Sequence, residues 1–468
     1  MRELTLVQQL GEFAGAQTPG TLPDDVAAST RQRVLDVIGL CLAATRLPTS
    51  QAMLDYALAQ GGAEQAAAVG AKRRLPAPQA AFVNGVLAHS LDYDDTHLPS
   101  ILHPSASIVP AALAAGEAAG VSGAEVITAA AVGIEICVRL GMAGYDREAA
   151  NSRFFERGQH ATSICGGLGA AAAAAYVYGL GADGVANAIG VAASMSSGIL
   201  EANRTGGTVK RLHCGWAAHA GVTAADLVAR GFTGPPTVLE GRFGLYQAWL
   251  SGEFDPDEIT RGIGEEWSVP GIFFKPYPAN HFTHAGIDAA RRMRDAGLRP
   301  EDVDHALLEV APPTVRTIGE PIEAKRRPVS GYQAQFSGPY TVAAALVGGG
   351  GLGLALEDFT DEAASRPDVL ALMDRIDVAG DEDLLRIYPN QFPARLTVRT
   401  RDGSVLGEEV LVNRGGPGDP LTDDELATKF RDNATTVLDE VAAKDLEVRI
   451  RDLGSAPDVG SVLAPVCG

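Results

Sequence analysis

The segment GAAAAAAYVYGL, residues 169–180, places six consecutive alanines after a glycine. Side chains this small let neighbouring helices approach closely from several sides. The whole chain shares this character, since it contains 54 glycines and only 6% aromatic residues. Apolar residues at the spacing of a buried helix stripe also follow Pro23 and recur in residues 107–120, 126–142 and 215–229. The first part of the chain, about 265 residues, is therefore expected to be all-α.

The pattern changes near residue 270, where Pro270, Pro276 and Pro278 stand close together. Residues 395–401 alternate between apolar and polar, turn at Asp402-Gly403 and return through 405–412, which predicts a β-hairpin. The other elements expected here are a helix at 285–296, a strand at 306–310, a helix from Tyr340, and a helix from Thr422 with Glu425 at the capping-box spacing.

These patterns together predict a mainly α protein with two domains. We expect a large all-helical domain built from both chain ends, residues 1–268 and 412–468, and a smaller inserted α+β lid domain, residues 269–411. A chain of 468 residues is long enough for two or three domains of ordinary size, and it can build its cores without disulfides.

Charge and cysteine content narrow the class of protein. The chain has 38 Lys and Arg against 58 Asp and Glu, a net charge of −20, which argues against binding to nucleic acid or to an anionic membrane. The five cysteines form no CxxC pair, so we expect reduced core thiols and neither a disulfide framework nor a zinc site. They are Cys41, Cys137, Cys165, Cys214 and Cys467.

No targeting or membrane segment is expected. The N-terminal residues MRELTLVQQLGEF carry charges and lack the apolar stretch of a signal peptide. The longest uncharged run, residues 328–356, contains Gln, Ser and four consecutive glycines, which is unlike a membrane span. We therefore expect a cytoplasmic protein.

The richest polar cluster is NGVLAHSLDYDDTH, residues 84–97, followed by His103. Carboxylates close to imidazoles suit proton transfer, because a carboxylate can set the tautomer of an imidazole that then works as an acid or base. Asp94 and Asp95 also suggest a divalent metal, whose ligands are oxygen and imidazole nitrogen. A helix C-terminus followed by a solvated loop explains the same residues without any chemistry.

A second cluster, RGQHATS at residues 157–163, leads into the alanine-rich segment. If a helix begins near Thr162, its free N–H groups can hold a carboxylate or an enolate-like oxygen close to His160. Alternatively Thr162 or Ser163 is a plain N-cap. The glycines that follow do not come after a strand, so we assign no dinucleotide site.

Two further clusters contain basic residues. GGTVKRLHCG, residues 206–215, offers Lys210 and Arg211 to an anion but lacks the order of a phosphate loop. KPYPANHFTH, residues 275–284, stands at the expected change of domain, where clefts commonly form and an anionic substrate could bind. For each of them alone, surface charge is the simpler explanation.

Taken in order, these four blocks resemble the MmgE/PrpD family, which includes 2-methylcitrate dehydratase, cis-aconitate decarboxylase and iminodisuccinate epimerase. FSGPY at residues 336–340 and GDPLT at residues 418–422 add to the likeness, which runs from about Asp36 to Phe430. The resemblance implies a helical large domain with a smaller α+β lid, commonly a homodimer. It also implies an active site with no organic cofactor and no metal, acting on a small anionic carboxylate.

The resemblance to the decarboxylase branch also implies a set of site residues. We expect His103, with His160 as second choice, to move the proton and Asp92 to orient the imidazole. Lysine ammonium groups would stabilise an enediolate next to a carboxylate. The predicted catalytic residues are His103, His160, Asp92, Lys210 and Lys275, and the predicted substrate-binding residues are Thr96, Arg211, His281 and His284.

Two departures from that branch weaken the case for decarboxylation. Asn280 stands where the branch has a histidine, and Ala324 stands where it has a tyrosine. The function predicted first is therefore a carbon–oxygen lyase (hydro-lyase) that dehydrates a small hydroxy-polycarboxylate. The alternatives are a cofactor-independent dicarboxylate epimerase, which is an isomerase, a cis-aconitate-type decarboxylase, and last a non-catalytic ligand-binding homologue.

Overall fold

The computed structural model describes residues 4–466, and their contacts divide them into two units. The first unit comprises residues 4–272 and 433–466, and the second comprises residues 273–432. Helix accounts for 56% and strand for 9% of the structure, so the prediction of a mainly α protein is confirmed. Cys467 lies outside the described residues; the other four cysteines are buried free thiols.

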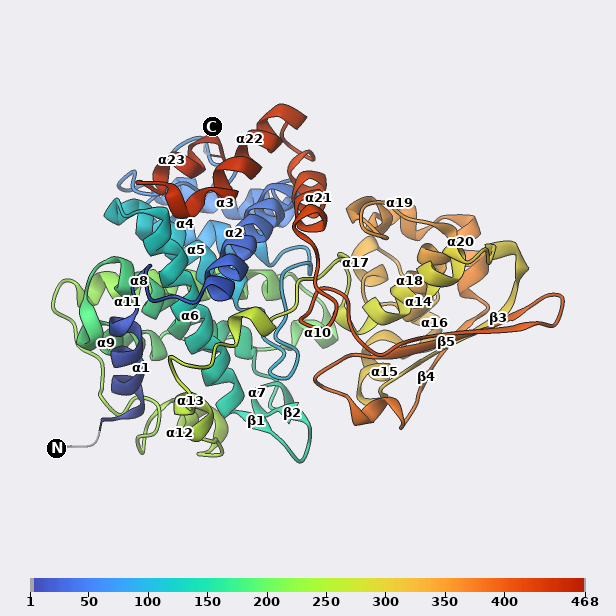
Figure 1. Cartoon of the computed structure of the whole chain (residues 1–468), viewed down its shortest axis with the longest axis horizontal. Helices are drawn as coiled ribbons and strands as arrows, with labels where there is room; N and C mark the ends of the chain where they lie inside the picture. The colour runs from blue at the N-terminus through green and yellow to red at the C-terminus, as the bar shows by residue number, and fades with distance from the viewer. Residues whose placement is uncertain (1–3, 467–468) are drawn as a thin grey trace. The chain divides into compact units, whose positions relative to one another are not determined.

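The first unit contains helices from both parts of the chain (Figure 1). From the first part come α1 (Leu6–Ala16), α2 (Asp24–Ala44), α3 (Pro48–Gln60), α4 (Ala77–Ala88), α5 (Ser105–Ala119), α6 (Gly123–Ala143), α7 (Arg153–Glu156), α8 (Ala161–Val177), α9 (Gly181–Ala193), α10 (Ala202–Thr205), α11 (Val209–Val228), α12 (Leu245–Leu250) and α13 (Asp257–Thr260). From the second come α22 (Glu440–Arg451), which packs against α2, and α23 (Gly460–Leu463).

Helix α8 is the centre of the first unit. It packs against α5, α6, α9 and α11, and its residues from Ala170 to Ala175 are fully buried. A Cβ atom on Gly169 would lie 2.5 Å from the carbonyl oxygen of Gly133 in α6, so the two backbones touch directly. The close packing predicted from the alanine-rich segment is therefore confirmed.

This contact gives a first prediction. We expect Gly169→Ala to lower the free energy of unfolding by about 1–3 kcal/mol, because the added methyl group overpacks the crossing of α6 and α8. Urea denaturation followed by circular dichroism measures the change. Gly20→Ala is the control, since its nearest neighbour would be 3.9 Å away. Equal unfolding midpoints for the two variants would contradict the prediction.

Helix α6 is, among the described residues, the one helix long and apolar enough to cross a membrane by length and composition. In its most apolar window 94% of the residues are buried inside the unit. Burial to this extent is typical of a core helix.

The expectation that this unit is all-helical is wrong in one place. Strands β1 (Tyr145–Asp146) and β2 (Asn151–Ser152) pair antiparallel between α6 and α7. Each strand is two residues long, too short to show the alternation by which a strand is recognised in a sequence.

The second unit contains a four-stranded mixed sheet in the order β4-β3-β5-β6. Strand β3 pairs parallel with β4 and antiparallel with β5, which pairs antiparallel with β6. The predicted hairpin with its turn at Asp402-Gly403 is confirmed, whereas β4 was not predicted. The strands are β3 (Val303–Val310), β4 (Ile376–Gly380), β5 (Ala394–Thr400) and β6 (Val405–Val410).

Helices α14 and α18 pack on this sheet and bury its apolar residues, among them Leu308 and Leu396. The helices of this unit are α14 (His284–Asp295), α15 (Pro312–Ile318), α16 (Ile322–Lys325), α17 (Gly331–Ala334), α18 (Gly338–Val347), α19 (Asp361–Ala364), α20 (Pro367–Met373) and most of α21 (Asp423–Ala434).

The chain returns to the first unit later than predicted, at residue 433 rather than 412. The segment between these positions is held in the second unit. The backbone N–H of Phe274 donates to Gly415, 2.9 Å, and Arg414 donates to the hydroxyl of Tyr277, 3.1 Å. The capping box at Thr422 forms as predicted, with the Glu425 carboxylate accepting from the Thr422 N–H at 2.8 Å.

Candidate active site

The first polar cluster folds back on the end of α4. His89 caps this helix, and its Nδ1–H donates to Asp94 Oδ2 at 2.7 Å, with both side chains fully buried. The Nε2 atom of His89 is also buried and has no hydrogen-bond partner among the described residues. The alternative of a solvated loop is therefore wrong for this segment.

Asp95 points to a different partner from Asp94. Its carboxylate lies 2.7 Å from Arg33 Nη1 on α2, with both side chains 1% exposed, and accepts hydrogen bonds from the backbone and the hydroxyl of Ser105. Because the two neighbouring carboxylates turn apart, they do not form the joint metal site that the sequence suggested.

Another trio, His89, Asp94 and Cys214, has ligand atoms within 4.8 Å of one another. Metal binding would require a thiolate. Burial raises the pKa of the Cys214 thiol well above its ordinary value, which keeps it protonated. The imidazole of His89 is already hydrogen-bonded to Asp94. Without a metal, these groups therefore form a hydrogen-bonded histidine–aspartate pair beside a neutral thiol.

His103 is oriented by the backbone of the same loop. Its Nδ1 lies 2.7 Å from the carbonyl oxygen of Asp95, so Nδ1 carries the hydrogen and the neutral ring keeps its lone pair on Nε2. Thr96 Oγ1 is 3.4 Å and Asp94 Oδ2 is 4.0 Å from the same nitrogen. The His103 side chain is 10% exposed, which leaves this base within reach of a ligand.

His160 stands at the N-cap of α8, so the helix predicted to start near Thr162 begins one residue earlier. Thr162 and Ser163 are not the cap: Thr162 Oγ1 accepts from the His103 N–H at 3.2 Å, and Ser163 Oγ donates to the carbonyl of His213 at 3.1 Å. Burial lowers the pKa of His160 well below its ordinary value, and the neighbouring imidazoles and the Lys210 ammonium lower it further. His160 is therefore neutral at pH 7.

Lys210 joins the cluster from the first turn of α11. Its Nζ lies 3.4 Å from Asp92 Oδ1, and the Lys210 side chain is 16% exposed. Asp92 has φ +52°, a left-handed conformation that aspartate tolerates better than most residues. Arg211, one residue on, donates to Thr49 Oγ1 on α3 at 3.0 Å, which directs its guanidinium toward that helix.

The first unit thus brings together five of the predicted residues: Asp92, Thr96, His103, His160 and Lys210. It adds three that were not among the predicted catalytic or substrate-binding residues, namely His89, His213 and Asp94, which the sequence had suggested only as a metal ligand. Ring centroids lie 5.3 Å apart for His89 and His103, and 5.7 Å apart for His89 and His160. The three additions stand within the same blocks, so the clustering of polar residues was the available signal.

Three of the predicted residues lie in the second unit. Lys275, His281 and His284 are 1%, 4% and 1% exposed, so surface charge does not explain them. The rings of His281 and His284 are 4.5 Å apart, and His284 Nε2–H donates to the carbonyl of Ala279 at 3.1 Å.

The two departures from the decarboxylase branch have local explanations in this unit. The Asn280 side chain accepts from the N–H of Phe282 at 3.1 Å and caps the short helix η2 (His281–Thr283). Ala324 is exposed on α16, where the following Lys325 donates to the carbonyls of Thr317 and Phe336 at 2.6 and 2.9 Å.

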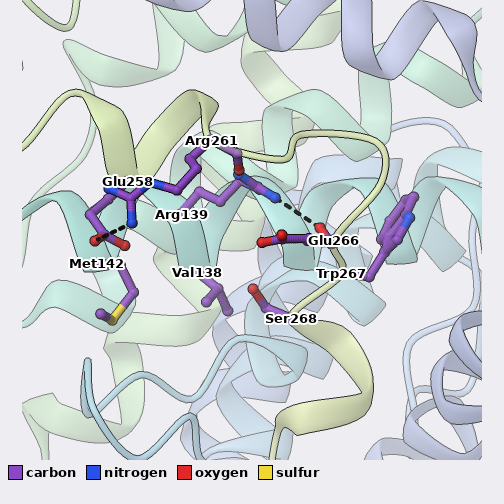
Figure 2. Close-up of a pocket in the computed structure, with 8 residues that line it drawn as sticks. All are labelled: Val138, Arg139, Met142, Glu258, Arg261, Glu266, Trp267 and Ser268. Atoms are coloured by element: carbon purple, nitrogen blue, oxygen red, sulfur yellow. Dashed lines mark hydrogen bonds and ion pairs between the residues drawn. The ribbon is translucent and has the colours of Figure 1, made fainter.

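A separate pocket in the first unit, shown in Figure 2, is a weaker candidate. Its central cation, Arg139, lies 2.7 Å from Glu135 Oε1 and donates to the backbone carbonyls of Ile259, Arg261 and Glu266. A guanidinium with these partners holds the segment around α13 in place. The pocket is lined by Val138, Arg139, Met142, Glu258, Arg261, Glu266, Trp267 and Ser268.

Comparison with known proteins establishes the family. The profile of the MmgE/PrpD N-terminal domain matches residues 8–257, and that of the MmgE/PrpD C-terminal domain matches residues 277–454. The chain belongs to the MmgE/PrpD family, as the resemblance predicted. It is thereby an enzyme of a family of lyases that act on small carboxylates.

Its relatives carry related names. The chain is 28% identical to the cis-aconitate decarboxylase-like protein oryM of Aspergillus oryzae, over 96% of this chain and 95% of that protein. It is 30% identical to the cis-aconitate decarboxylase of Homo sapiens, over 94% and 90% of the two chains. It is 26% identical to a cis-aconitate decarboxylase of Aspergillus terreus, over 98% and 95%.

Proposed function

We propose that this enzyme eliminates water from a small hydroxy di- or tricarboxylate, through negative charge that forms on the carbon next to a carboxylate. One observation carries the proposal. Two buried imidazoles, those of His103 and His160, are held by different partners, and the ammonium of Lys210 is near enough to His160 to lower the pKa of that ring. Elimination of water needs one group to take a proton and another to give one, and these two imidazoles suit the two tasks.

The roles follow from the hydrogen bonds. His103 Nε2 takes the C–H proton, because its Nδ1 already donates to a carbonyl. His160 gives a proton to the departing hydroxyl, so that the C–O bond breaks, water leaves and a C=C bond forms. The positive charge of Lys210 stabilises the enediolate, which carries more negative charge than the substrate. Lys275 remains predicted as a second such cation on the ground of the resemblance alone.

Decarboxylation is the second candidate, and the names of the relatives favour it. In that reaction a C–C bond breaks, carbon dioxide leaves and one proton is returned to carbon. A single proton donor is enough, so two separately oriented imidazoles would be more than the chemistry needs. Epimerisation would use the same base and return the proton to the opposite face.

Proton NMR in deuterium oxide distinguishes these reactions. A panel of hydroxy di- and tricarboxylates, with cis-aconitate added as a decarboxylation probe, is incubated with the enzyme and with a protein-free control. We expect the C–H signal next to a carboxylate to be lost and a vinyl signal to appear with one of the hydroxy acids.

Other outcomes would count against dehydration. Deuterium incorporation with inversion and no vinyl signal would indicate an epimerase. Release of carbon dioxide from cis-aconitate with no reaction of the hydroxy acids would indicate a decarboxylase. A panel in which no acid exchanges or reacts would contradict the proposed chemistry as a whole.

A further inference from the structure

His213, in the first turns of α11, makes the most direct contact between two histidines in the cluster. Its Nδ1 lies 2.9 Å from the Nδ1 of His160, and the ring centroids are 4.9 Å apart. A hydrogen bond between two imidazole nitrogens uses one hydrogen, so one Nδ1 donates and the other accepts. The resemblance gave His213 no role.

The position of His213 is fixed by the packing of its helix. A Cβ atom on Gly221 of α11 would lie 2.5 Å from the Cβ of Ala170 in α8, so these helices cross closely. The carbonyl of His213 also accepts from Ser163 Oγ on α8 at 3.1 Å. His213 is 6% exposed, which leaves a narrow contact with solvent.

Both imidazoles of the pair are neutral at pH 7. Burial lowers the pKa of His213 to about 4, and it lowers the pKa of His160 well below its ordinary value. The groups that face the pair act in the same direction: His89 and Lys210 on both rings, and His103 on His160. The pair therefore holds two hydrogens and no net charge.

Neutrality creates a difficulty for His160 as a proton donor. A neutral imidazole that gives up its Nε2 hydrogen becomes an anion, which is far too unfavourable for an acid working near pH 7. The His160 ring stays neutral only if its Nδ1 receives a hydrogen as its Nε2 loses one. His213 Nδ1, at 2.9 Å, is the described group placed to deliver that hydrogen.

We propose that His213 is a positioning residue that lets neutral His160 act as an acid by passing a hydrogen from its own Nδ1 to the Nδ1 of His160. This inference rests on the proposed function of His160. As the Nε2–H of His160 is transferred to the departing hydroxyl, the Nδ1–H of His213 moves to His160. The Nε2 of His213 then takes a proton from a water molecule, and the hydroxide so formed takes from His103 the proton that came from the substrate carbon. Both rings begin and end neutral, and protons balance.

The critical variant is His213→Asn. The asparagine amide can donate a hydrogen bond to His160 Nδ1 but cannot hand over its hydrogen. We expect dehydration turnover to fall by about 10- to 100-fold, part of the roughly 10²–10⁴-fold that a positioned acid or base contributes. KM should stay close to its original value. Deuterium exchange at the substrate carbon should persist, since His103 performs that step.

His219→Asn is the matched control on the same helix. His219 Nδ1 lies 3.1 Å from the carbonyl of Pro78, and its ring stacks on Trp216, so it shares the helix but not the pair. This variant should keep normal turnover. Normal turnover in His213→Asn would overturn the proposal, and so would parallel loss of turnover and exchange in a folded variant.

A measurement on the unaltered enzyme tests the pair without substrate. Long-range ¹⁵N NMR of histidine-labelled protein reports which ring nitrogens carry hydrogen, and His160→Gln and His213→Gln samples assign the signals. We expect one protonated Nδ1 between the two rings and no titration of either from pH 5.5 to 8. A cationic ring at pH 7 would overturn the relay. Absence of exchange with every acid would instead overturn the proposed function and leave this result standing.

Discussion

Replacing His103 by alanine is expected to lower turnover by about 10²–10⁴-fold, because the variant removes the group that takes the proton from carbon. The fold should survive, since the side chain is 10% exposed and its described partners are a carbonyl, a hydroxyl and a carboxylate of its own loop. Steady-state kinetics with the acid identified by NMR measure the effect, and circular dichroism verifies the fold.

His305→Ala is the control for this variant. His305 lies on β3 of the second unit with its side chain 41% exposed and Nε2 2.9 Å from Asp377, so it should have near-normal turnover. If His103→Ala turns over at close to the normal rate while correctly folded, the assignment of the base is wrong. His160 then becomes the leading candidate for that role.

Replacing Arg33 by methionine is expected to cause the largest loss of stability. The change leaves the carboxylate of Asp95 buried without its cation, and removal of one member of a buried pair costs about 3–5 kcal/mol. Arg33 Nη2 also donates to the carbonyls of Val269 and Ile272, at 3.0 and 2.7 Å, which lose a partner as well. Urea denaturation of the two proteins measures the difference.

Arg230→Met applies the same substitution to an exposed ion pair. Arg230 and Asp226 are 65% and 43% exposed, so loss of this pair should cost only about 0–1 kcal/mol. In the double variant Arg33→Met with Asp95→Asn, the loss of unfolding free energy should be smaller than the sum of the losses in the two single variants. The reason is that no unpaired buried charge remains. Equal destabilisation by Arg33→Met and Arg230→Met would contradict the importance of burial.

Local sequence patterns predicted the helices and the hairpin because these elements have their own periodicity. The alanine-rich segment of α8 and the alternation of residues 395–401 can each be recognised from about twelve residues of sequence or fewer. Strand β4 was missed because its five residues are mostly half-buried and show no clear alternation. The chain re-enters the first unit only at residue 433, because residues 412–432 contact residues 273–277 of the second unit. No local pattern in residues 412–432 reveals these contacts.

In the candidate site, too, the residues could be predicted from the sequence, whereas their long-range contacts could not. The polar blocks and their order indicated the family, and the resemblance implied Asp92, His103, His160 and Lys210. The pairing of His160 with His213 joins positions 53 residues apart, and that of Arg33 with Asp95 joins positions 62 apart. Partners at such separations are determined by helix packing, so the polar blocks and the resemblance could indicate the residues of the site but not the hydrogen bonds and ion pairs among them.

The run of six alanines in α8 limits how the sequence of this enzyme can change over generations. Residues 170–175 are fully buried with the smallest side chains that still favour a helix, so almost every mutation there adds volume to a filled space. Few substitutions at these positions fit without overpacking the core. An enlarged side chain there is expected to lower stability before it can alter the candidate site, whose polar residues lie in the loop that follows α4 and in the first turns of α11.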